Sequence, residues 1–211
     1  PGPSPTPTPV ATPTPTGGPT PTPTAALPAT GIRASSLTLR DDAKPPINLD
    51  TRTMRFRSAA YQGVPGGAFS PAFGSNADPT LLGSSGGGAT LTVYNPGGTE
   101  KVVIPLPAGS WQRTGNNVQP GYKYRDPKRT SGPITLISLN NGRLSLSGKG
   151  AALYGLAGAP QGTIGIRLRL GNGVEYCAVG PAKAPVATND TTAKFVSSAN
   201  AAAPVVCPPV P

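Results

Sequence analysis

The chain has 211 residues, of which 29 are proline and 28 glycine, about 27% together, and only 12% are charged. This composition excludes a coiled coil or a helical bundle, whereas 36% hydrophobic residues suffice for one modest core. Lys and Arg number 18 against 8 Asp and Glu, which gives a formal net charge of +10. Such an excess predicts acidic partners: nucleic acid, acidic polysaccharide or an anionic cell surface.

Residues 1–28 contain 11 of the prolines and no charged residue, and proline alternates with threonine through most of them. Proline fixes φ and removes a backbone donor, so the tract predicts an extended polyproline II arm. Pro/Thr-rich stalks are typical sites of O-glycosylation, with an unmodified spacer as the alternative. The candidate acceptors are Thr6, Thr8, Thr12, Thr14, Thr16, Thr20, Thr22 and Thr24.

From residue 35 onward, apolar and polar residues alternate with period two, which predicts half-buried β-strands. Three pairs of such segments are joined by turn sequences at 95–98, 140–142 and 171–173, and each pair predicts a hairpin. The alternating apolar positions include Leu37, Leu39, Met54, Phe56, Leu91, Val93, Leu144, Leu146, Ile164, Ile166, Leu168 and Leu170.

Roughly eight to ten strands are expected between residues 35 and 180, and no segment has a useful helical period. The predicted fold class is all-β, an antiparallel β-sandwich of immunoglobulin-like or jelly-roll-like form, with a β-barrel as the alternative. Three parts are expected: the arm over 1–32, the sandwich over 33–180 and an Ala/Pro-rich tail over 181–211. A Gly/Pro/Ser-rich loop is expected over 62–88.

Cys177 and Cys207 are the two cysteines, and their spacing fits neither a metal site nor a C-x-x-C redox motif. A single disulfide that pins the tail is the favoured interpretation, and two free thiols in a reducing compartment are the alternative. With the Pro/Thr-rich tract, the disulfide predicts an extracellular or cell-surface location. No run of 18 apolar residues exists, so no membrane span is expected.

The chain has no histidine, which removes the commonest general base and any Ser-His triad. The eight Asp and Glu residues form no recognisable acid pair, and no metal-ligand spacing is present. We therefore expect a protein that is not an enzyme and that uses no cofactor or metal.

Residues 121–129 interleave two tyrosines with positive charge, a pattern that can stack bases or sugars and contact phosphates. The favoured alternative is an amphipathic strand with its tyrosines inward, and Trp111 is likewise expected in the core. Two further segments, 52–57 and 167–169, have basic strand faces that would form one strongly positive surface if the strands were neighbours. The alternative is that these charges lie on exposed strands and discourage uncontrolled pairing with other strands. The candidate anion contacts are Arg55, Arg57, Lys123, Arg125, Arg167 and Arg169.

A group of short motifs occurs in a characteristic order. The motifs are Leu91-Thr92-Val93-Tyr94-Asn95, Leu106-Pro107, Trp111, Gly121-Tyr122-Lys123-Tyr124, Arg167-Leu168 and Tyr176-Cys177-Ala178. In this order they resemble a small all-β domain that recurs, often after low-complexity linkers, in secreted bacterial proteins of unassigned function. The resemblance covers about residues 35–180. It implies an extracellular β-module and no catalytic residues.

The leading functional hypothesis is a structural protein, the subunit of a homopolymeric surface filament, fibre or matrix. In this hypothesis the arm lies on an adjacent subunit, and the segment with Leu37 and Leu39 adds a strand to the neighbour's sheet. The alternative is a secreted binding module on a Pro/Thr stalk, whose basic faces bind acidic glycan or extracellular nucleic acid. Of these two ligands, nucleic acid is not favoured.

Overall fold

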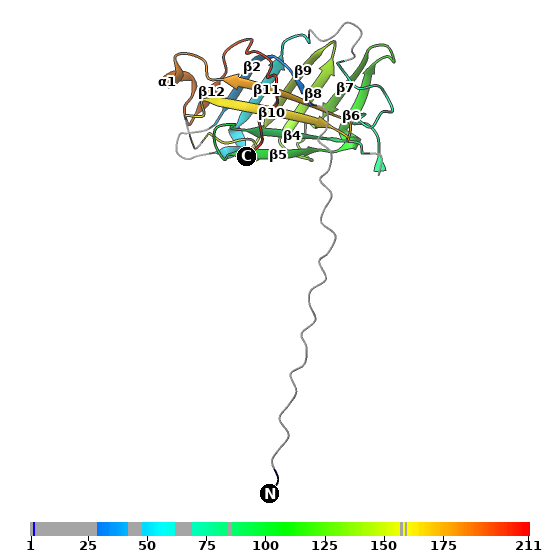
Figure 1. Cartoon of the computed structure of the whole chain (residues 1–211), viewed down its shortest axis with the longest axis horizontal. Coiled ribbons are helices and arrows are strands. Elements are labelled where there is room, and N and C mark those ends of the chain that lie inside the picture. Colours follow the sequence, from blue (N-terminus) through cyan, green and yellow to red (C-terminus); the bar gives the residue numbers. More distant parts are fainter. Residues whose placement is uncertain are drawn as a thin grey trace.

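The computed structural model describes residues 2, 29–41, 48–61, 69–83, 86–156, 158 and 160–211. Two facing β-sheets form the framework of this structure, which confirms the predicted antiparallel sandwich (Figure 1). All eight threonines predicted as glycosylation sites lie outside the described residues.

Each sheet consists of strands from distant parts of the chain. The five-stranded sheet has the order β1 (Ala29–Gly31), β11 (Val174–Pro181), β10 (Thr163–Leu170), β4 (Ala89–Tyr94) and β5 (Lys101–Leu106). The seven-stranded sheet has the order β12 (Lys194–Val196), β2 (Ala34–Arg40), β3 (Thr53–Ser58), β9 (Arg143–Lys149), β8 (Ile134–Asn140), β7 (Pro120–Arg125) and β6 (Trp111–Gly115). Short helical turns lie at Leu49–Thr51, Ala108–Ser110 and α1 (Val186–Asn189).

The three predicted hairpins are confirmed as the antiparallel pairs β4–β5, β8–β9 and β10–β11. At the β8–β9 turn, Asn141 and Gly142 have φ values of 49° and 69°. Positive φ at both central residues is what the tight hairpin turn requires, which explains the Asn-Gly sequence there. Among the described strands, only β1 pairs in parallel, with β11.

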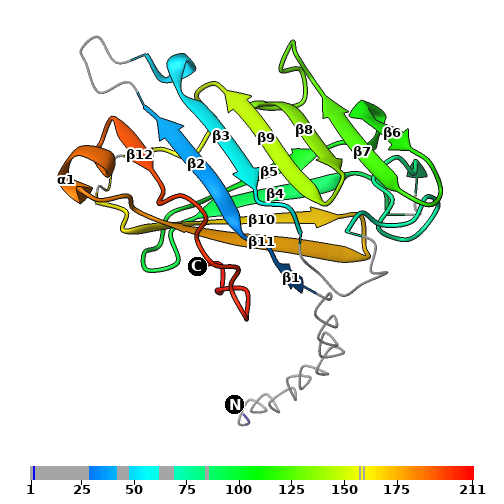
Figure 2. The same cartoon turned by 90° about the horizontal axis from the view of Figure 1, so that it is seen from above.

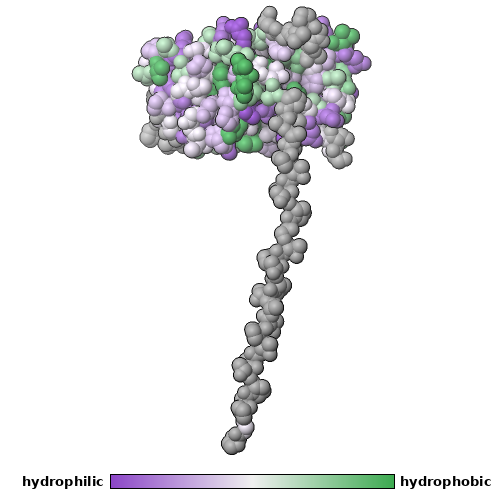
Figure 3. Space-filling view, viewed as in Figure 1, coloured by the Kyte–Doolittle hydropathy of each residue, from purple (hydrophilic) through white to green (hydrophobic). Residues whose placement is uncertain are grey.

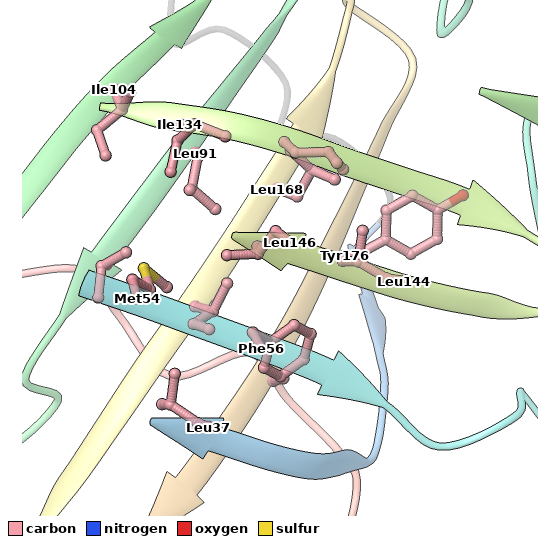
Figure 4. Packing of buried hydrophobic residues seen from close by; sticks show 14 of the residues in the cluster. Leu37, Met54, Phe56, Leu91, Ile104, Ile134, Leu144, Leu146, Leu168 and Tyr176 are labelled. Atoms are coloured by element: carbon pink, nitrogen blue, oxygen red, sulfur yellow. The ribbon is translucent and has the colours of Figure 1, made fainter. Parts of the chain in front are cut away.

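The core lies between the sheets, whose strands cross at a wide angle (Figure 2). Inward side chains such as Met54 and Phe56 of β3 meet Leu91 of β4 and Leu168 of β10, and each is at most 1% exposed (Figure 4). Every second residue of these strands faces this layer, as the period-two pattern predicts.

The aromatic residues of β6 and β7 also belong to this core. Tyr122 and Tyr124 are fully buried, and Trp111 is 5% exposed and packs edge-on against Tyr124. The amphipathic-strand interpretation of residues 121–125 is therefore confirmed, as is the core position of Trp111.

Leu37 and Leu39, the candidate subunit contacts, lie in the core of their own chain and are each 1% exposed. Their strand β2 is hydrogen-bonded on both sides, to β12 and to β3. In this fold neither leucine is available to a neighbouring subunit, because both side chains and both edges of the strand are already occupied.

The sandwich extends beyond the predicted boundaries at both ends. The end of the arm supplies β1, and the predicted tail supplies β12, which pairs with β2. The predicted disulfide between Cys177 of β11 and Cys207 is present. The tail is thus part of the domain as well as being pinned to it.

Removal of the disulfide should destabilise the protein strongly. The bond closes a segment with a sequence separation of 30, and the chain-entropy model gives about 3–4 kcal/mol for a loop of that length. We expect Cys177→Ser/Cys207→Ser to lower the free energy of unfolding by about that amount in urea titrations. Reduction of the wild type serves as the control, and a loss below about 1 kcal/mol would contradict the expectation.

Candidate anion-binding surface

The outer surface of the seven-stranded sheet is basic. Its strands contain no Asp or Glu, and since most of their inward alternates are apolar, every cation on these strands except Arg113 of β6 points to solvent. We call this surface the basic face. Its cations are Arg40, Arg55, Arg57, Lys123, Arg125, Arg143, Lys149 and Lys194, of which all but Lys123 and Lys194 are exposed.

The strand register places these cations in rows across the sheet. Arg57 of β3 lies opposite Ser145 of β9, and Ser145 lies opposite Ser138 of β8. Ser138 in turn lies opposite Lys123 of β7. Since neighbouring strands are about 4.8 Å apart, the backbones of β3 and β7 are roughly 14 Å apart. Two cations therefore flank two hydroxyl groups in one row.

A second row runs beside the first and has the same order of cations, with a leucine in the place of one serine. Arg55 lies opposite Ser147, and Leu136 of β8 lies between Ser147 and Arg125 of β7. The two rows define what we call the serine lane, bordered by Arg55 and Arg57 on one side and by Lys123 and Arg125 on the other. Its floor consists of Ser138, Ser145, Ser147 and Leu136.

Four of the six predicted anion contacts thus share the basic face, and two do not. Arg167 and Arg169 lie on β10, in the other sheet, so their outer face is on the opposite side of the sandwich. β3 and β10 are not neighbours, so the condition for one shared positive surface is not met. Arg167 also pairs with Glu175 at 2.9 Å and donates a hydrogen bond of 3.2 Å to the Cys207 carbonyl.

The cations of the basic face have no carboxylate partner within 4.0 Å among the described residues. The three ion pairs among the described residues lie elsewhere and join Arg52 to Asp41, Arg113 to Asp78 and Arg167 to Glu175. Because like charges are adjacent and uncompensated, an anion bound at the lane would relieve their repulsion.

Arg113 of β6 lies opposite Tyr122, on the inward side of the sheet, and pairs there with a buried acid. Its guanidinium lies 2.7 Å from Asp78 and stacks on the Phe73 ring at 5.1 Å. Burial alone would raise the pKa of Asp78, but hydrogen bonds from Gly74, Thr80 and Arg113 outweigh it and lower that pKa. The ionised Asp78 thereby holds the loop over 69–83 against the sheet.

Asp126 organises the turn that follows β7. Burial would raise its pKa, but hydrogen bonds from the backbone amides of Ser131 (2.7 Å) and Thr130 (3.0 Å) lower it. The turn presents Lys128 and Arg129, which line a hollow with Lys149 of the basic face, Asp50, and residues 132–133 and 150–152. These two cations extend the positive surface beyond one end of the lane.

No aromatic ring reaches the basic face from its strands. All five aromatic residues on the strands of this sheet are at most 5% exposed: Phe56, Trp111, Tyr122, Tyr124 and Phe195. Figure 3 shows the other side of the sandwich, where the five-stranded sheet is toward the viewer, and there hydrophobic residues form only small groups among hydrophilic ones. The basic face therefore offers charge and hydroxyl groups, without a stacking platform.

Sequence reasoning missed half of the cations on the basic face and all of its serines. The missed cations are Arg40, Arg143, Lys149 and Lys194. The signal was present in the segment 143–147, where Arg143, Ser145 and Ser147 alternate with two buried leucines. That alternation places the three polar side chains on one face without any structural information.

Several acids elsewhere have structural partners. Asp41 pairs with Arg52 at 2.8 Å, and Asp190 accepts hydrogen bonds from the amides of Gln161 and Gly162. In the described part of the chain, no three or more His, Cys, Asp or Glu residues are grouped as metal ligands would be. Nor does any helix there have the length and apolarity needed to cross a membrane.

Comparison of the chain with models of known protein families, with curated proteins and with solved structures found no match. The resemblance to a recurring secreted β-domain therefore remains a prediction.

Replacement of Asp78 should reduce stability in a pH-dependent way. The folded-state pKa of Asp78 is lowered, so its contribution is present above the unfolded value, about 3.9, and is lost as the pH falls through the folded value. We expect Asp78→Asn to lower the free energy of unfolding at pH 7 by about 2–3 kcal/mol. The difference from the wild type should shrink below about pH 4.

Urea titrations across this pH range measure both effects. Asp50→Asn is the control, because Asp50 is exposed. An Asp78→Asn variant as stable as this control at pH 7 would show that the Asp78–Arg113 contact contributes little.

Proposed function

We propose that the chain is a non-enzymatic, extracellular or cell-surface module that binds a linear acidic polysaccharide on its basic face. The observation that carries the proposal is the serine lane, where the strand register sets two pairs of cations on either side of three serines. No Asp or Glu belongs to any strand of that sheet.

The chemistry of the lane fits an acidic sugar chain. A guanidinium group binds a carboxylate or sulfate with two parallel hydrogen bonds, and a serine hydroxyl can donate to or accept from a sugar hydroxyl. Arg55 and Arg57 supply the first kind of contact, and Ser145 and Ser147 supply the second. The two rows lie about 7 Å apart along the strands, and Arg143 and Lys149 at the two ends of β9 extend the basic face to about 20 Å, which suits an extended polymer.

Acidic polysaccharide is favoured over nucleic acid for a physical reason. Proteins that bind single-stranded nucleic acid combine positive charge with aromatic side chains on which bases stack. The tyrosines of β7 are fully buried, so the lane lacks that second component.

Two features support a location outside the cell. Disulfides persist in oxidising compartments, and the Cys177–Cys207 bond joins residues with a sequence separation of 30. The Pro/Thr composition of residues 1–28 is typical of exposed extracellular stalks.

Binding should depend on the cations that border the lane. We expect Arg55→Ser/Arg57→Ser and Lys123→Ser/Arg125→Ser each to weaken binding of polygalacturonate or dextran sulfate at least about tenfold, because each lost charge-assisted contact contributes about 1.5–3 kcal/mol. Titration calorimetry measures the affinities, with neutral dextran as the ligand control. Added salt should weaken the binding through screening.

The matched control is Arg33→Ser/Arg169→Ser, which removes the same charge from outside the seven-stranded sheet. The affinity of this control variant should stay within about twofold of the wild-type affinity, which is a change of about 0.4 kcal/mol or less in the free energy of binding. Equal losses of affinity in all three variants would show that binding depends on net charge alone and not on the lane. Tighter binding of single-stranded nucleic acid through the same residues would show that nucleic acid is the ligand.

A specific observation also favours a second function, as a self-associating structural subunit. The end of the arm forms the edge strand β1, where Ala29 lies opposite Glu175 and Gly31 opposite Cys177 of β11. The Pro/Thr-rich arm is therefore connected to the sandwich at a sheet edge, from which it can reach a second copy.

Deletion of residues 1–28 should leave the sandwich folded and abolish self-association. The deletion must end before Ala29, because β1 and β2 belong to the sheets. Negative-stain microscopy and sedimentation velocity compare the two chains, and thermal melting checks the fold. A truncated chain that still polymerises, or a full chain that is monomeric at every concentration, would refute this second function.

A further inference from the structure

The C-terminal segment crosses the outer face of the five-stranded sheet (Figure 2). Cys207 is bonded to Cys177 of β11, and the Pro208 carbonyl accepts a hydrogen bond of 2.9 Å from the hydroxyl of Tyr94 on β4. The Pro211 carbonyl accepts one from Lys101 on β5. The segment therefore runs across the strands, from β11 towards β5.

The sheet holds this segment through donors alone. Arg167 donates to the carbonyls of Cys207 and Pro208, while Tyr94 and Lys101 donate to those of Pro208 and Pro211. All the acceptors are backbone oxygens. Since proline has no backbone N–H, a proline-rich chain offers acceptors with few donors, and this site matches that property.

The donors are held in place by their own surroundings. The Tyr94 ring covers Gly165, where an added Cβ would lie 2.6 Å from the ring. The Arg167 guanidinium lies 5.9 Å from the centre of that ring and is fixed by Glu175 at 2.9 Å. A rigid array of donors loses little entropy when a chain binds it.

One donor of the site is unused. The Nε atom of Arg167 is buried and has no hydrogen-bond partner among the described residues. A buried donor without a partner is costly, so a further carbonyl at this position would be stabilising. The C-terminal segment therefore leaves one donor of the site without an acceptor.

We propose that this surface is a docking site for extended proline-rich chains, which we call the proline site, and that its occupant in an assembly is the Pro/Thr-rich arm of a second copy. Its residues are Tyr94, Lys101, Gly165 and Arg167. The proposal rests on the self-association function above. Because the contacts are to carbonyls, Thr-Pro repeats can satisfy the donors as residues 208–211 do, and residues 1–28 contain 11 prolines.

Exchange of occupants requires no redox step. Residues 208–211 lie beyond the disulfide, none of them is buried, and they make no backbone–backbone hydrogen bond within the described structure. Their hydrogen bonds within the described structure come from the side chains of Tyr94, Lys101 and Arg167. The arm of a second copy can therefore displace these four residues while Cys207 remains attached.

Deletion of residues 208–211 tests the proposal, because it removes the competing occupant. The tethered segment has an effective concentration of roughly millimolar, so its deletion should strengthen self-association at least tenfold in sedimentation velocity. Adding Tyr94→Phe and Lys101→Met to the deletion should give a monomer, since the two changes remove donors and leave the Tyr94 ring on Gly165. Thermal melting confirms that each variant folds.

A synthetic peptide of residues 3–24 should dissociate the oligomers, and the same peptide with alanine for each proline should not. Association that survives Tyr94→Phe/Lys101→Met, or no gain from the deletion, would overturn the proline site. If deletion of residues 1–28 still abolished assembly in that case, the self-association function would stand and the arm would dock elsewhere. Arg55→Ser/Arg57→Ser should leave this association unchanged.

Discussion

The register of the seven-stranded sheet is the constraint on which the rest of the molecule depends. Met54 and Phe56 are at most 1% exposed, so β3 cannot slip by one residue without moving both into solvent and its two arginines into the core. Burial of apolar area thus fixes where Arg55 and Arg57 point. The basic face is a direct consequence of core packing, and the serine lane is as rigid as the core beneath it.

The distribution of acids explains why the excess charge gathers on one face. Asp78 and Asp126 are buried and hydrogen-bonded inside turns, and Glu175 is paired with Arg167 on the other sheet. These carboxylates stabilise loops and strand ends, where each satisfies several backbone amides or a guanidinium. Few acids remain at the surface, and none is on a strand beside the lane.

Local patterns in the sequence predicted most of the strands, the three hairpins and the inward tyrosines, because each depends on neighbours along the chain. The pairing of strands between distant segments could not be predicted in this way. Arg55 and Arg167 have the same local pattern yet lie on opposite sides of the sandwich. β12 has only three residues, too few for a visible period, and it is the strand that encloses Leu37 and Leu39 within the sheet.

The two surfaces lie on opposite outer faces of the sandwich, which makes the two functions compatible. A copy docked through Tyr94 and Arg167 leaves Arg55 and Lys123 free on the far side. An assembly built through the proline site would then present one basic face per subunit along its length. Because a polysaccharide repeats its charges, several weak lanes on one assembly would bind it far more tightly than a single domain. Self-association would in this way supply the affinity that one shallow, flat surface lacks.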